Sequence, residues 1–191
     1  MNLHRVETKI FAADDTNFTQ EELIPIFHRW IREKRLPETL LIDVADYRHV
    51  HGGPGVVLIA HELDIAMDAA DEQLGMRLAT KRDSLADAHT KVLANLRLAL
   101  DVCCKLEEDT KNRLHFRGDR FQVRVLDRLV APNTNETFAA ARPALMEVFS
   151  RVLATSSVVV EHAAESRSPF TVLVSAATSP PMRELLGRCS A

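Results

Sequence analysis

The sequence lacks the features that mark membrane spans, secretion signals and disulfide scaffolds. No stretch approaches 18 consecutive apolar residues, and the first residues contain no apolar core of a signal peptide. The three cysteines, Cys103, Cys104 and Cys189, have neither the spacing of a disulfide framework nor that of a zinc site. We therefore expect a cytoplasmic protein with no membrane partner.

Excess positive charge and aromatic side chains, which nucleic-acid binders use, are also scarce. The formal net charge is −3, and the chain has one Trp and one Tyr. A binder of nucleic acid needs a positive field along the phosphates and often a set of exposed stacking rings. Five arginines form a basic stripe that we interpret as a solvated or ion-paired face: Arg113, Arg117, Arg120, Arg124 and Arg128. We expect no nucleic-acid partner.

Motifs for nucleotide binding and for nucleophilic catalysis are missing. The chain has no Gly-x-Ser-x-Gly turn and no Gly-Lys-Ser/Thr sequence. The glycine-rich segment 51–55 could offer backbone amides to an anion, but a predicted strand follows it where a phosphate-binding loop needs a helix. The sequence therefore identifies no cofactor and no substrate.

The composition that remains is that of an ordinary folded domain. Apolar residues make up 46% of the 191 residues and charged residues 27%. A chain of this length buries enough surface for one good core, whereas two halves would each lie near the lower size limit of a stable domain. We predict a single domain over residues 1–191.

An internal repeat organises that domain. Residues 16–19, Thr-Asn-Phe-Thr, match residues 134–137, Thr-Asn-Glu-Thr, at an offset of 118, and the same offset places Pro25 on Pro143. Thr19 and Glu22 have the spacing of a helix-capping box. The identities are few, so chance similarity is the alternative. We predict an α+β fold of duplicated β-α-β-β units that form a largely antiparallel sheet and are joined by a long central helix.

The predicted boundaries follow from the repeat and from the turn residues. Pseudo-repeat 1 covers about residues 4–82, the connecting helix 84–109, pseudo-repeat 2 about 114–177, and a short C-terminal helix 180–188, which Gly187 closes. We expect one long strand over 56–67, with Asp64 and Asp68 on its solvent face. We expect a strand or a hairpin over 114–130, with Gly118-Asp119 as the turn.

The long central helix has two interpretations. Its leucines and other apolar residues recur every seven positions in three columns, which suits a helix that lies on a sheet. In the first interpretation the helix packs wholly inside its own domain. In the second, part of it forms the interface of a homodimer, because a helix of about 40 Å is long for one duplicated unit.

One loop is present in the first unit only, and we place the candidate ligand site there. The corresponding segment of the second unit is three residues shorter, so features shared by both units are treated as scaffold. The candidate ligand-binding residues are Asp46, Tyr47, His49, His51, Gly52 and Gly53. The competing interpretation is a polar hairpin tip whose glycines adopt unusual backbone angles.

A metal site in the same region is a further hypothesis. Imidazole and carboxylate groups bind zinc, iron or manganese when about three of them converge on the ion. The candidate ligands are His49, His51, His61 and Glu62. No helical His-x-x-x-His spacing supports them, and the expected hairpin keeps His61 far from His49.

Two functional hypotheses follow. The first is a non-catalytic protein that self-associates, through the long helix or a sheet edge, and binds a partner or a small ligand. The alternative is a small-molecule enzyme, metal-dependent in one version, that uses residues of the Asp46–Glu62 region.

Overall fold

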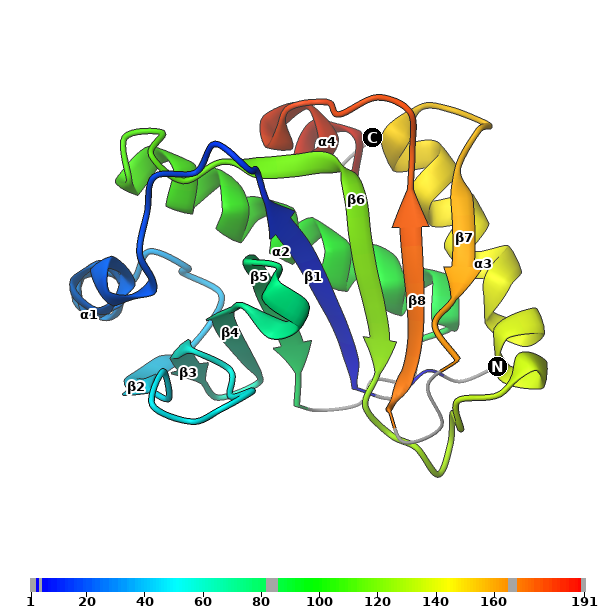
Figure 1. Ribbon diagram of the computed structural model, residues 1–191, viewed down its shortest axis with the longest axis horizontal. Helices are drawn as coiled ribbons and strands as arrows, with labels where there is room; N and C mark the ends of the chain where they lie inside the picture. Colours follow the sequence, from blue (N-terminus) through cyan, green and yellow to red (C-terminus); the bar gives the residue numbers. More distant parts are fainter. Residues whose placement is uncertain (1–2, 4, 82–85, 165–167, 190–191) are drawn as a thin grey trace.

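Strand β1 lies inside an eight-stranded sheet in which every neighbouring pair is antiparallel, in the order β2-β3-β4-β5-β1-β6-β8-β7 (Figure 1). The computed structural model describes residues 3, 5–81, 86–164 and 168–189. The strands are β1 (Val6–Ala12), β2 (Leu41–Asp46), β3 (Val56–Ala60), β4 (Leu63–Asp68), β5 (Gly75–Thr80), β6 (Phe116–Val125), β7 (Val159–His162) and β8 (Phe170–Ser175). The prediction of a mixed fold with a largely antiparallel sheet is confirmed.

Four α-helices and two short 3-10 turns complete the described elements. They are η1 (Gln20–Glu22), α1 (Leu23–Glu33), η2 (Ala70–Glu72), α2 (Ala88–Asp109), α3 (Asn135–Leu153) and α4 (Met182–Cys189). Helix α2 packs on β1 and β5, α3 on β7 and β8, and α4 on β6. Figure 1 shows α2 and α3 behind the sheet. The sheet therefore has a covered face, toward these helices, and an opposite face that we call the open face.

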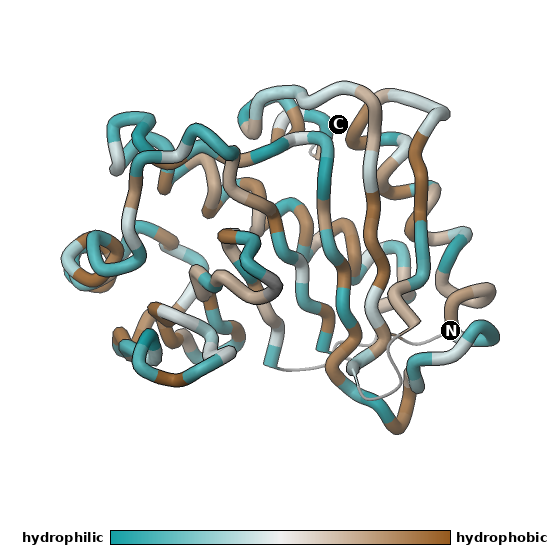
Figure 2. The backbone as a smooth tube through the Cα atoms, viewed as in Figure 1, coloured by the Kyte–Doolittle hydropathy of each residue, from teal (hydrophilic) through white to brown (hydrophobic). Residues whose placement is uncertain are grey.

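The covered face contains the core. Along β1 and β6 the side chains alternate between the two faces, and Val6, Ile10, Phe121 and Val123 point into an apolar cluster with α2 and α3. Figure 2 shows the matching alternation of hydrophobic and hydrophilic residues along these strands. Helix α1 joins the same cluster through Phe27 and Trp30, whose rings meet at 5.6 Å between centroids.

Helix α2 is covered by its own chain. Asp87 caps it by accepting a hydrogen bond from the Thr90 amide at 2.8 Å. The large apolar side chains of α2 lie against the sheet or against α3 and α4, and none is among the exposed large apolar residues of the described chain. These contacts fit the interpretation in which the helix packs inside its own domain. The start predicted at Ser84 lies outside the described residues.

Several predicted boundaries are wrong. The expected long strand over 56–67 is two strands, β3 and β4, because the chain turns at His61 and Glu62. Of the two alternatives for 114–130 the structure has the strand, β6, and the turn expected at Gly118-Asp119 lies inside it. A Cβ at Gly118 would lie 2.0 Å from the Pro180 carbonyl oxygen, so glycine allows a close crossing of two backbones. Gly187 lies inside α4 and does not end it.

The helix starts agree with the repeat in kind but not in spacing. Thr19 and Glu22 form the predicted capping box, with the Thr19 amide 3.1 Å from the Glu22 carboxylate, and Thr134 caps α3. The prolines, however, differ in position. Pro25 lies in the first turn of α1, where it removes no helical hydrogen bond, whereas Pro143 lies inside α3. The expectation of prolines at one distance from the cap is therefore wrong.

The strand order also differs between the two predicted units. In the second unit β8 lies beside β6, whereas in the first unit β3 is separated from β1 by the hairpin of β4 and β5. The order strand, helix, strand, strand occurs in both units, and both α1 and α3 end on a residue in the left-handed conformation, Lys34 and Ala154. Duplication remains a prediction.

Among the described residues, no helix combines the length and apolar character that a bilayer crossing requires.

Candidate functional site

Two rows of cross-strand neighbours on the open face bring charged side chains together at the middle of the sheet. In the first row Gln122 of β6 lies beside Lys9 of β1, and Lys9 beside Arg77 of β5. In the second row Arg124 lies beside Glu7. Antiparallel pairing places such neighbours about 5 Å apart, so the two rows form one charged patch across three strands.

Asp68, at the end of β4, links this patch. Its carboxylate lies 2.5 Å from the Lys9 Nζ and 2.7 Å from an Arg77 Nη. The Glu7 carboxylate lies between Arg77 and Arg124, at 3.3 Å from the Arg77 Nε and 3.6 Å from the Arg124 Nη1. The five side chains form a continuous chain of ion pairs, which we call the charge network: Glu7, Lys9, Asp68, Arg77 and Arg124.

Glu7, Lys9 and Asp68 of the charge network are buried, and Arg77 and Arg124 are half-buried, although no α-helix of the described chain packs on this face. The Asp68 and Lys9 side chains are 0% and 4% exposed. Lys9 also donates to the Gln73 carbonyl at 2.7 Å, and Asp68 accepts from the Ala70 amide, so the η2 segment closes over the pair. Gly75 makes room for it, because a Cβ there would lie 2.7 Å from the Lys9 Cε.

Burying ions is costly unless each has partners, and here the partners are incomplete. The side-chain atoms Gln122 Oε1 and Arg124 Nε are buried without a hydrogen-bond partner among the described residues. Burial lowers the pKa of Lys9, and the neighbouring Arg77 and Arg124 act in the same direction, while Asp68 opposes them. Positive charge on this patch is therefore under-compensated.

A cavity of about 130 Å³ opens on this part of the network. Its charged lining consists of three cations, Lys9, Arg120 and Arg124, and one anion, Asp68. The Arg120 guanidinium lies over the Phe11 ring, 4.8 Å from its centroid, which fixes the arginine at the rim. We call this hollow the basic cavity.

A second cavity of about 280 Å³ lies on the other side of the network and reaches the predicted loop. Glu7 and Arg77 line it together with Tyr47 and Pro54, and apolar residues of β3 and β4 form part of its wall. Three further charged residues line it: Arg5, Asp64 and Lys81. The structure thus brings one predicted site residue, Tyr47, to a cavity next to the charge network.

The carboxylate of Asp46, the neighbour of Tyr47, is ion-paired with Arg48. Arg48 makes a two-pronged contact with its carboxylate, Nε at 2.9 Å and Nη2 at 2.7 Å. These hydrogen bonds lower the pKa of Asp46 to about 2. A carboxylate that is so acidic and already paired is a poor general acid or base near neutral pH.

The other predicted loop residues lie at the hairpin tip. His49, His51 and Gly52 are exposed and line none of the cavities described above. Gly52 has a φ of 65°, which favours glycine, and the close approach of Gly53 to Val50 leaves no room for a Cβ. These geometries agree with the competing interpretation, in which glycines shape a tight polar turn.

The four predicted metal ligands lie at two ends of one hairpin. His49 and His51 precede β3, whereas His61 and Glu62 follow it, so the whole strand separates the pairs. His61 Nδ1 lies 3.9 Å from the Glu62 carboxylate, and both side chains are exposed. In the described part of the chain, no three His, Cys, Asp or Glu residues are grouped so that they could hold a metal ion.

The cysteines offer no activated nucleophile. All three are buried and free, and burial raises the pKa of Cys104 and of Cys189 to about 11 and that of Cys103 further. Thiols in this state remain protonated at neutral pH and are poor nucleophiles.

Sequence reasoning missed most of the charge network. Asp68 was expected on a solvent face, and that expectation is wrong, because the side chain is fully buried. Glu7 and Lys9 were not singled out at all. The available signal was the recurrence of polar residues at alternate positions of three strands, but a sequence does not say which strands become neighbours.

Neither the protein-family models nor the curated proteins compared with this chain give a match.

Proposed function

We propose that the protein is a non-catalytic binding protein whose basic cavity takes the oxyanion of a small ligand, a phosphate or a carboxylate group. The observation that carries the proposal is the charge balance of this cavity, three cations against one carboxylate, together with the donor Arg124 Nε, which is buried without a hydrogen-bond partner among the described residues. An oxyanion would accept hydrogen bonds from Arg124 and Arg120. It would also favour the charged form of Lys9, whose pKa is lowered by burial first and by Arg77 and Arg124 in addition. The volume suits a head group more than a whole metabolite.

The adjoining cavity gives the rest of such a ligand a place. Its apolar wall and Tyr47 could contact a body attached to the oxyanion, and the ion pairs from Arg77 to Asp68 and from Glu7 to Arg124 join the linings of the two cavities. This arrangement supports binding, because the linings of the two cavities combine positive charge with apolar surface. The catalytic alternative in the Asp46–Glu62 region has less support, since Asp46 is held by Arg48.

Thermal unfolding in inorganic phosphate tests the proposal. At ten times its Kd, phosphate should stabilise the native state by about 1.4 kcal/mol, which raises Tm by about 3–6 °C for a chain of this size. Sulfate and acetate, at the same ionic strength as a chloride reference, separate a preference for a tetrahedral oxyanion from one for a carboxylate.

Variants locate the effect. Arg120→Gln and Arg124→Gln should each remove most of the phosphate-dependent rise in Tm, because each takes a cation from the basic cavity. Arg120 makes no ion pair among those found in the described chain, so its loss should leave the fold intact. Arg142→Gln, at an exposed position of α3, is the matched control and should respond as the wild type does. An equal rise in all variants would refute the site.

Self-association through the β2 edge is a second candidate, favoured by the distribution of exposed apolar residues. Leu40 and Ile42 are 67% and 53% exposed, and Tyr47 and Val50 follow β2. An edge strand with free backbone groups and apolar side chains is a template for pairing. Light scattering should give twice the mass of one chain, and Ile42→Lys should give monomers while Val159→Lys, on the opposite edge strand, should not. A wild-type monomer at high concentration would exclude this candidate.

A further inference from the structure

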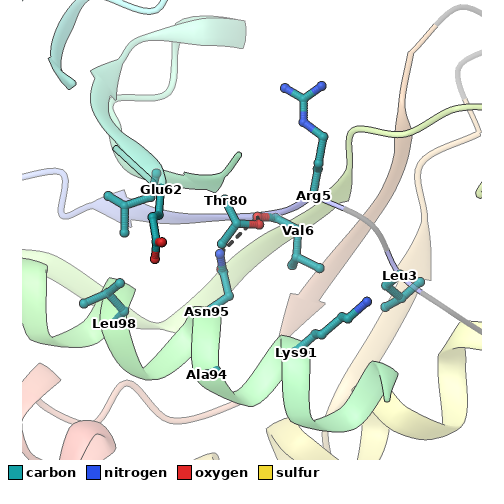
Figure 3. A pocket seen from close by; sticks show the side chains of 10 residues that line it. Leu3, Arg5, Val6, Glu62, Thr80, Lys91, Ala94, Asn95 and Leu98 are labelled. Carbon is teal, nitrogen blue, oxygen red and sulfur yellow. Dashed lines mark hydrogen bonds between the residues drawn. The ribbon is translucent and has the colours of Figure 1, made fainter. Parts of the chain in front are cut away.

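A cleft of about 380 Å³ lies between α2 and the ends of the strands, on the covered side of the sheet (Figure 3). Leu3, Val6, Leu63 and Leu98 supply the apolar part of its lining, and Asn95 lies at its centre in the view of Figure 3. Three charged residues also line it: Arg5, Glu62 and Lys91. The cleft shares no lining residue with the basic cavity. Its volume falls in the range of about 300–1,000 Å³ that is usual for small-molecule sites.

Asn95 is the feature of the cleft that needs an explanation. The residue is 3% exposed, and its Nδ2 donates to the Val6 carbonyl at 3.0 Å and lies 3.4 Å from the Leu78 carbonyl. A flipped amide would place its oxygen against these two carbonyl oxygens, so the contacts fix its orientation. The other atom, Oδ1, is buried without a hydrogen-bond partner among the residues that the structure describes.

The nearby Thr80 hydroxyl does not donate a hydrogen bond to Asn95 Oδ1. Thr80, which lines the same cleft, donates its only hydroxyl proton to the Val6 carbonyl at 3.0 Å. A buried amide oxygen without a hydrogen-bond donor is unfavourable, because it has lost its contact with water and gained no partner. A ligand that brings an O–H or N–H group to this point would remove the cost, and the leucine side chains would cover its apolar body.

We infer that this cleft binds a second small molecule, a neutral aliphatic compound that donates a hydrogen bond, as an alcohol or an amide does, to Asn95 Oδ1. The pattern is that of small-molecule sites in general, in which apolar walls supply affinity and a few fixed polar atoms supply orientation. The inference does not depend on the oxyanion site, because the two lie on opposite faces of the sheet.

Two isomeric probes test the inference, 1-pentanol and butyl methyl ether. They have the same atoms and similar size, but only the alcohol can donate a hydrogen bond. In titrations followed by ¹⁵N–¹H correlation spectra, 1-pentanol should shift the side-chain amide of Asn95 and the backbone amides of Ala94 and Leu98 in a saturable way. The ether should bind about tenfold more weakly, because it leaves Asn95 Oδ1 unpaired.

Two tryptophan variants place the binding. Ala94 lines the cleft at an exposed position of α2, so Ala94→Trp should fill the space and abolish the saturable shifts without disturbing the core. Arg97→Trp adds the same ring at an exposed position of α2 outside the cleft lining and should bind 1-pentanol as the wild type does. Equal affinity for the two isomers, or no saturable shift with the alcohol, would overturn the inference.

Discussion

The two faces of the sheet bury their side chains by opposite means. On the covered face, β6 contributes Phe121 and Val123 to an apolar core closed by helices. On the open face, the residues between them, Gln122 and Arg124, join a patch in which Lys9 and Asp68 are as deeply buried as many core residues. Burial alone therefore does not predict an apolar side chain, because the open face is closed by charged side chains that cover one another.

Under the proposed function, the two faces serve different purposes: the covered face stabilises the fold, and the open face offers charged groups to a ligand. Apolar packing on the covered face has no unmet electrostatic requirement, so it contributes to folding directly. Ion pairs of the charge network gain little over an apolar replacement, since desolvation offsets their attraction. A network that contributes little to stability but concentrates cations at a cavity is better explained by binding than by folding.

The largest difference in the free energy of unfolding is expected between two neighbouring residues of β6, one on each face of the sheet. Phe121→Ala should lower the free energy of unfolding by about 3–5 kcal/mol, because the ring is fully buried and lies 5.2 Å from the Phe149 ring, centroid to centroid. Gln122→Ala, one residue along on the open face, should cost less than about 1 kcal/mol. Urea unfolding measures both. Similar costs for the two variants would mean that the faces do not differ as described.

A smaller effect is expected within the charge network. Asp68→Leu leaves Lys9 and Arg77 without their shared carboxylate and should cost about 3 kcal/mol. Adding Lys9→Met to the same chain should bring the unfolding free energy back to within about 1 kcal/mol of the wild type, since the buried ammonium is then gone as well.

The double variant also separates the two roles of the patch. It should remain folded in urea titrations and keep most of the rise in Tm with phosphate, because losing Lys9 and Asp68 together leaves the excess of two positive charges at the basic cavity unchanged. If the double variant were far less stable than Asp68→Leu alone, the network would be a structural element and the binding argument would lose its basis.

The sequence predicted the element types well where local signals are strong. The capping box at Thr19, the long helix through Leu96 and Leu100, and the short C-terminal helix were all predicted close to their positions. The predictions were wrong where the local structure depends on contacts with residues far away in the sequence. Gly118 resembles a turn residue, but it serves a crossing with Pro180. The turn at His61 and Glu62 contains no glycine or proline that would have marked it.

The site was predicted only in part for the same reason. Tyr47 could be selected because it follows a strand beside an unusual loop, and it does line a cavity. Lys9 and Asp68 are 59 positions apart, and the pairing that joins them runs through β5, which lies between β1 and β4. The order of the strands in the sheet determines that contact, and neither the hydrophobic periodicity nor the internal repeat predicts that order.

The central claim is that the open face binds an oxyanion at the basic cavity, where three cations line the wall with one carboxylate. A titration of ¹⁵N-labelled protein with inorganic phosphate, at constant ionic strength, tests it most directly. The account predicts saturable shifts for the amides around the basic cavity, those of Lys9, Phe11, Ala70, Gln122 and Arg124, and unchanged positions for the amides of α2. Small shifts that grow linearly with phosphate and scatter over exposed basic residues would contradict it.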